Sequence, residues 1–177
     1  GVSALTMGDH LDAQFAPTVG LMAAAAAAPG LRIGALTYAN DYRHPVLLAK
    51  EAATLDVLSG GRLELGIGAG WMTTDYEQAG IPLDPAGVRI DRLAEALTVL
   101  KGLFADGPVD FAGEHYRLAG LEGTPKPVQR PHPPILIGGG GKRILTLAAQ
   151  QADIVGLNFN LHGGRIDASV GPDGTAE

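Results

Sequence analysis

The sequence predicts an α/β fold built around a parallel sheet. Five short apolar segments alternate along the chain with segments of helical periodicity, and glycine or proline residues separate most of them. Strands that alternate with helices form right-handed βαβ units. Nearly continuous apolar runs are typical of strands that are buried on both faces. Two folds meet this description, a doubly wound sheet and a (β/α)₈ barrel, and hydrophobic periodicity alone does not choose between them.

The N-terminal half is expected to hold three of the strands and two helices. The strands are expected at residues 2–6, 31–38 and 62–68. An alanine-rich helix is expected at 17–28 and a second helix at 45–58. The second helix begins with Pro45 and is followed by Gly60 and Gly61. Proline at a helix start and glycine just past its end is the usual asymmetry of helix termini.

The C-terminal half continues the alternation. Residues 88–104 are expected to form a long helix, because apolar side chains recur there at helical spacing. Weak alternation over 109–118 predicts a small hairpin inserted after this helix. The remaining expected elements are a buried strand at 135–137, a helix at 142–151 and a strand at 153–157. The polar, glycine-containing residues 159–177 are expected to form a flexible tail or an insertion loop.

Composition excludes several classes of protein and site. Thirteen basic and nineteen acidic residues give a net charge of -6, which disfavours a nucleic-acid partner. Without cysteine there are no disulfides or thiolate metal sites, and the histidines show no metal-ligand spacing, so no metal is expected. The longest apolar run, 21–28, is too short to cross a membrane. The opening Gly-Val-Ser has no signal-peptide character, so we expect a cytoplasmic protein.

A run of four glycines is the strongest candidate for a binding site. Gly138, Gly139, Gly140 and Gly141 lie between a buried strand and a helix, at the end of the strand where functional groups gather in parallel α/β folds. Glycines let a ligand approach the backbone closely, and the free N–H groups of a helix start attract an anion. Lys142 adds positive charge. We interpret this turn as a phosphate site, because a plain tight turn would need only one or two glycines.

The best candidate for acid–base chemistry is His10, with Asp9 as the neighbouring carboxylate that could tune it. Adjacent residues of a strand point to opposite faces, so Asp9 need not touch His10. Taken alone, an Asp-His pair is more often structural. His44 precedes a helix and is interpreted as an entry-turn or capping group. Three further acidic residues are interpreted as helix-cap charges only: Asp75, Glu77 and Asp84.

A second glycine-rich segment spans residues 66–70. It is not a dinucleotide fingerprint, because the G-x-G-x-x-G spacing fails at the last glycine. Gly68 and Gly70 are better explained as a strand end that leaves space above it for a flat ligand. The sole tryptophan, Trp71, follows directly and would either wall a ligand pocket or anchor the core.

Taken together, these motifs resemble the bacterial luciferase-like family of flavin-dependent and F420-dependent oxidoreductases. The matching segments are residues 9–11, 40–45, 49–56, 59–63, 66–71, 89–92, 125–131 and 135–141. The block from 43 to 71 is the most specific of them, and the resemblance extends to about Asn158. The sequence looks closest to actinobacterial, F420-dependent members of the family.

The resemblance implies a TIM barrel that is incomplete, with about five of its eight strands in a domain spanning residues 1–158. It also implies FMN or F420 with its ring at the barrel mouth, its phosphate in the glycine loop, a non-proline cis peptide within 37–39, and a homodimer. The residues so assigned to the cofactor are Thr37, Tyr38, Ala39, Asn40, Gly68, Gly70, Trp71, Thr74, Gly138, Gly139, Gly140, Gly141 and Lys142. Those assigned to catalysis are His10 and Asp9.

The function that we expect from these observations is hydride transfer between coenzyme F420 and a small organic substrate. Trp71 and Gln14 stand where the family's sugar-phosphate dehydrogenases carry Glu and Trp, which argues against sugar-phosphate oxidation. Two alternatives stay open. One is an FMN-dependent luciferase-like monooxygenase, and the other is a truncated, non-catalytic relative that binds flavin or has a structural role.

Overall fold

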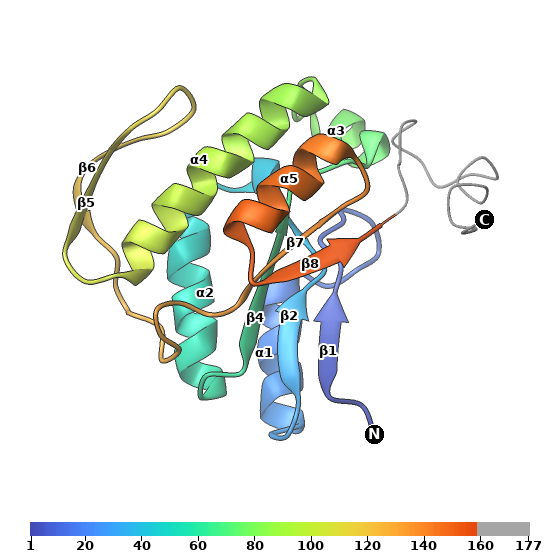
Figure 1. Ribbon diagram of the computed structural model, residues 1–177. Coiled ribbons are helices and arrows are strands. Elements are labelled where there is room, and N and C mark those ends of the chain that lie inside the picture. The colour runs from blue at the N-terminus through green and yellow to red at the C-terminus, as the bar shows by residue number, and fades with distance from the viewer. Residues whose placement is uncertain (159–177) are drawn as a thin grey trace.

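The computed structural model describes residues 1–158, in which helices pack against a parallel sheet of six strands and a two-stranded hairpin projects to one side (Figure 1). The tail expected at 159–177 lies outside the described residues. The sheet consists of β1 (Ala4–Met7), β2 (Arg32–Ala35), β3 (Tyr38–Ala39), β4 (Leu63–Gly68), β7 (Ile135–Gly139) and β8 (Ile154–Leu157). The helices are α1 (Pro17–Ala27), the 3-10 helix η1 (Asn40–Tyr42), α2 (Pro45–Ser59), α3 (Thr73–Ala79), α4 (Ala86–Phe104) and α5 (Lys142–Gln151). The hairpin pairs β5 (Pro108–Ala112) with β6 (Arg117–Glu122).

The order of the strands decides which parallel fold this is. The order is β1-β2-β4-β7-β8, β3 also pairs with β4, and every neighbouring pair is parallel. The sheet therefore advances in one direction with the sequence, whereas a doubly wound sheet reverses its order at a switch point. The result is a curled half-barrel (Figure 1). The prediction of an incomplete (β/α)₈ barrel is confirmed.

The strand expected at 31–38 is two strands, β2 and β3. Gly34 pairs with Glu64 and Tyr38 pairs with Ile67, so this segment advances by four residues while β4 advances by three. The extra residue interrupts the ladder in the manner of a bulge. The peptide bond between Leu36 and Thr37 is cis, one bond before the segment 37–39 in which it was expected, so that placement was wrong.

Helix α2 begins at the residue that the sequence predicts and ends one residue later than expected. His44 is its N-cap, and the Nδ1 atom of His44 accepts a hydrogen bond from the Val46 N–H at 3.3 Å. Gly60 closes the helix in the left-handed conformation, with φ at 70°, which a residue without a Cβ adopts at little cost. The interpretation of His44 as a capping group is confirmed. Within residues 1–158, none of the helices combines the length and apolar character needed to cross a membrane.

The hydrophobic core lies between the outer face of the sheet and the helices. Leu65 and Ile67 of β4 and Ile137 of β7 are fully buried in one cluster with Leu93 and Leu97 of α4. Because side chains alternate along a strand, the residues between these positions point to the inner face. On β4 and β7 the inner positions are largely glycine, and this sets the shape of the site described below.

The hairpin is tied to α4 by one carboxylate. Glu95 accepts hydrogen bonds from the backbone N–H groups of Glu114, His115 and Tyr116 at 2.7, 2.9 and 3.1 Å. Desolvation raises the pKa of Glu95, but the three backbone donors outweigh it, so the pKa lies below its ordinary value. A lowered pKa in the folded state means that this contact stabilises the hairpin above the unfolded pKa, and that the stabilisation is lost as the pH falls through the folded pKa.

We therefore expect acid to loosen the hairpin. Amide hydrogen exchange at residues 114–116 should be slower in the wild-type protein than in Glu95→Ala at neutral pH. The two proteins should converge as the pH falls below about 4, where the carboxylate becomes protonated. A difference in protection that persisted unchanged into strong acid would contradict this role for the Glu95 charge.

Candidate active site

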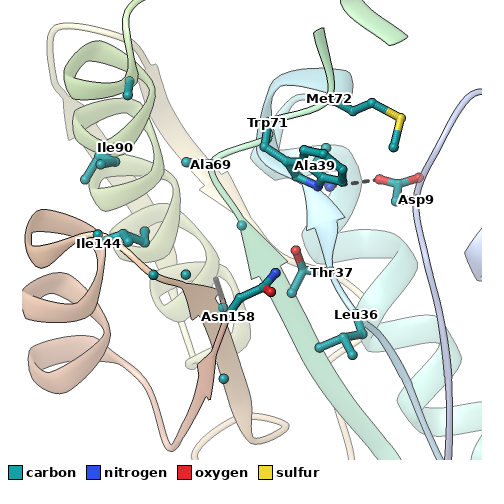
Figure 2. Close-up of a pocket in the computed structure, with 18 of the residues that line it drawn as sticks. Asp9, Leu36, Thr37, Ala39, Ala69, Trp71, Met72, Ile90, Ile144 and Asn158 are labelled. Atoms are coloured by element: carbon teal, nitrogen blue, oxygen red, sulfur yellow. Dashed lines mark hydrogen bonds between the residues drawn. The ribbon is translucent and has the colours of Figure 1, made fainter. Parts of the chain in front are cut away.

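A cavity of about 490 Å³ opens at the carboxyl ends of the strands (Figure 2). A volume of this size suits a cofactor or small ligand, for which pockets usually measure about 300–1,000 Å³. In Figure 2, Ile90 and Ile144 line one side, and Trp71 and Thr37 lie opposite. The wall is completed by Asp9, His10, Leu36, Ala39, Tyr42, Gly68, Ala69, Gly70, Met72, Ala86, Gly138, Gly139, Gly140, Gly141, Gly156, Leu157 and Asn158.

Glycines form the floor of this cavity. The Thr37 side chain lies beside two of them: a Cβ at Gly138 would lie 3.6 Å from Thr37 Cγ2, and one at Gly68 would lie 2.6 Å from Thr37 Oγ1. A side chain at Gly68 would therefore displace Thr37. The floor is flat and carries few side chains, because β4 and β7 present glycine at their inner positions. A planar ring could lie against such a surface.

One end of the cavity is the start of helix α5. Gly141 is the N-cap of this helix, no side chain caps it, and its first turn holds no acidic residue. A Cβ added to Gly141 would meet no atom within 4 Å, so the space beside this residue is open. The first N–H groups of a helix have no partner within the helix and carry the positive end of its dipole. This end of the cavity is therefore suited to an anion such as a phosphate.

His10 stands at the opposite wall and is held by groups from two other segments. Its Nδ1 atom lies 2.8 Å from Oδ2 of Asp75, which also accepts a hydrogen bond from the Tyr42 hydroxyl at 3.1 Å. The Trp71 ring meets the His10 ring edge to face, with centroids 5.6 Å apart and planes at 85°. Asp75 lies in the first turn of α3 and is 4% exposed. It is more than the cap charge that the sequence suggested.

The structure does not bring the Asp9 carboxylate to His10. Asp9 Oδ2 accepts hydrogen bonds from Arg43 at 2.6 Å and from the backbone N–H of Ala39 at 2.9 Å (Figure 2), and Oδ1 accepts a second bond from Arg43 at 3.0 Å. Arg43 also lies over the Tyr38 ring, 4.9 Å from its centroid. Burial lowers the pKa of Arg43, but the hydrogen bonds to Asp9 and the Asp9 charge outweigh burial. The pKa of Arg43 therefore lies above its ordinary value. Asp9 thus fixes the backbone of β3.

Comparison with known proteins agrees with this geometry. A sequence profile of the luciferase-like monooxygenase family matches residues 1–168. The chain belongs to this family. An FMNH₂-dependent dimethylsulfone monooxygenase of Pseudomonas putida is 34% identical over 66% of the chain and 32% of its own length. An uncharacterized protein of Mycobacterium tuberculosis is 36% identical over 71% of the chain and 43% of its own length.

A solved structure of the same fold is the F420-dependent tetrahydromethanopterin reductase of Methanopyrus kandleri. It superposes with a TM-score of 0.82 at 24% identity, covering 90% of this chain and 48% of the reductase. The chain therefore spans about a third to a half of the length of these three proteins.

Most of the residues predicted for this luciferase-like site line the cavity. They are Asp9, His10, Thr37, Ala39, Gly68, Gly70, Trp71, Gly138, Gly139, Gly140 and Gly141. Asn158, which the sequence places after the last described strand, lines it as well. The four exceptions are Tyr38, Asn40, Thr74 and Lys142.

Each exception has a local reason. The Tyr38 hydroxyl bonds with Thr18 at 3.0 Å and its side chain is buried in the core, because alternate residues of β3 face opposite ways. The Asn40 amide donates to the Tyr116 hydroxyl at 3.2 Å. Lys142 lies in a groove between α4 and α5 and is exposed. Thr74 lies beside Asp75 on α3, outside the lining.

Several lining residues were not predicted from the sequence, and neither was Asp75 as the partner of His10. These lining residues are Leu36, Tyr42, Ala69, Met72, Ala86, Ile90, Ile144, Gly156 and Leu157. Tyr42 had a usable signal, because it follows a strand end and lies one residue before the specific block 43–71. In the described part of the chain, no group of three or more His, Cys, Asp or Glu residues is placed to hold a metal ion.

Proposed function

We propose that this chain is the cofactor-binding part of an oxidoreductase that transfers a hydride between coenzyme F420 and a small organic substrate. The observation that carries the proposal is the continuity of the glycine floor with the uncapped start of α5. The first offers a surface for a planar ring, and the second offers free N–H groups to a phosphate. The donor set and the shape of the cavity both fit such a cofactor.

Each part of the cavity would have its own role in binding or catalysis. The backbone at Gly140 and Gly141 would hold the phosphate, and Trp71 and Ile90 would exclude water from the walls of the cavity. When bound, F420 supplies the carbon that gives or takes the hydride. His10, with its Nε2 atom left free by the contact at Nδ1, would move the proton that accompanies reduction or oxidation of the substrate.

An FMN-dependent monooxygenase is the second candidate. The observation that favours it is the 34% identity to a dimethylsulfone monooxygenase whose name states dependence on FMNH₂. The same glycine floor and helix start would hold FMN, which also combines a planar ring with a phosphate. The third possibility, which the same experiment tests, is a non-catalytic relative that binds flavin or has a structural role.

Titration of the purified chain with F420 and, separately, with FMN distinguishes the three. We expect F420 fluorescence to change in a saturable way with micromolar affinity, and added acceptor substrates to oxidise F420H₂. Tight binding of FMN without binding of F420 would replace the proposal with the monooxygenase. Binding of neither cofactor would leave the non-catalytic reading, and binding without turnover of any acceptor would reject the enzyme proposal for this chain.

A further inference from the structure

Asp75 is a buried carboxylate that lies behind the wall of the cavity. It does not line the cavity itself, and its side chain is 6% exposed, whereas that of His10 is 21% exposed. Its Oδ2 atom lies 2.8 Å from Nδ1 of His10. Any effect of Asp75 on chemistry in the cavity must therefore act through the His10 ring.

The contact with Asp75 fixes where the His10 ring carries its proton. An ionised carboxylate has acceptors only, so at 2.8 Å the Nδ1 atom must be the donor. The neutral ring is then protonated on Nδ1 and has its lone pair on Nε2. This is the form in which Nε2 can accept a proton, and a ring protonated at both nitrogens can give one back.

Tyr42 holds Asp75 in the position that this requires. Its hydroxyl donates to the same Oδ2 atom at 3.1 Å, so that oxygen has donors from η1 and from the loop after β1. Burial raises the pKa of Tyr42 well above its ordinary value, and the Asp75 charge raises it further, so Tyr42 stays a donor. The Tyr42 ring packs on Tyr76 with centroids 5.4 Å apart, and the Tyr76 hydroxyl donates to Asp41 at 3.0 Å.

The nearby arginines are engaged elsewhere. Arg43 pairs with Asp9, and Arg92 pairs with Asp41 and Asp84. Among residues 1–158, the one ion-pair partner that Asp75 has is His10. A positive charge that appears on the His10 ring therefore meets a negative charge that no lysine or arginine neutralises. A buried carboxylate in this arrangement orients an imidazole and stabilises its cationic form.

We infer that Asp75, held by Tyr42, is the positioning residue that keeps His10 in the Nδ1-protonated form with Nε2 free for proton transfer in the cavity. This inference rests on the proposed function for the use of Nε2, but the tautomer is a property of the chain alone. The carboxylate partner of His10 is therefore Asp75, which lies 65 positions away in the sequence, and not its neighbour Asp9.

The ring tautomer can be read without cofactor or turnover. We would record ¹⁵N shifts of the histidine rings in the wild-type chain, in Asp75→Leu and in Asp75→Asn, and assign His10 by comparison with His10→Gln. The wild-type ring should be protonated on Nδ1. Asp75→Leu, of nearly the same shape but without an acceptor, should lose this preference, and Asp75→Asn should retain it through its amide oxygen. Asp84→Asn, which alters a carboxylate on the far side of Arg92, is the matched control and should leave His10 unchanged.

Two outcomes would overturn the inference. One is a wild-type His10 protonated on Nε2, and this test holds even if Asp75→Leu fails to fold. The other is a folded Asp75→Leu chain with an unchanged His10 tautomer. Where turnover is measurable, kcat of Asp75→Leu should fall by about tenfold or more at unchanged cofactor affinity. Absence of any turnover in the wild-type chain would reject the proposed function while the ring spectra still decide the role of Asp75.

Discussion

His10→Gln is expected to lower kcat by about 10²–10⁴-fold, the usual contribution of one positioned acid–base group. Glutamine is polar and of similar reach, so it preserves the wall of the cavity, but it cannot exchange a proton near neutral pH. Because the phosphate end of the cavity lies on the opposite wall, the dissociation constant of the cofactor should be nearly unchanged. Steady-state turnover with F420H₂ and an acceptor, together with a cofactor titration of the same preparation, measures both quantities.

His44→Gln is the control for this variant. His44 caps α2 and does not line the main cavity, so its replacement should cost a modest amount of stability and leave turnover as it was. If His10→Gln turned over at the wild-type rate, His10 would not be the proton-transfer group and the proposed role of its Nε2 atom would be rejected. If cofactor binding fell in parallel with turnover, His10 would act in binding.

The parts of the site that could be predicted from the sequence are those encoded within a short segment. The glycine run at 138–141 follows an apolar strand and opens a helix, so its place in the cavity wall depends on neighbours in the chain and not on distant contacts. His10 and Trp71 were found for a similar reason, since each follows a strand end. The position of Lys142 outside the cavity lining could not be predicted, because the direction of a side chain in the first turn of a helix depends on where the next helix packs, here α4.

The partners of these residues could not be predicted, because they come from distant segments. Asp9 is followed directly by His10, yet it pairs with Arg43, 34 residues later. Asp75 lies on α3, a seven-residue helix too short to show a periodicity. The same limit applies to the fold. Five alternating strands fit two architectures, and only the order of the strands, which is a long-range property, gives the half-barrel.

Gly141→Asp is expected to weaken cofactor binding by about 100-fold or more without destabilising the chain. Gly141 has φ at -89°, and a Cβ there meets nothing within 4 Å, so aspartate fits the backbone and the space. Aspartate is a favoured N-cap, and it would occupy the N–H groups that we assign to the phosphate. Its charge would add repulsion: two unit charges about 4 Å apart interact by roughly 4 kcal/mol at an effective dielectric constant of about 20.

Gly141→Asn is the matched control, because asparagine caps a helix about as well as aspartate but carries no charge. It should bind the cofactor between the wild-type and Asp variants, and the difference between the two variants should shrink as salt is raised. Thermal unfolding should show both variants at least as stable as the wild type. Stability and affinity would thus change in opposite directions, which general damage to the fold cannot produce. Equal affinity of the Asp variant and the wild type would place the phosphate away from α5 and remove the main support for the proposed function.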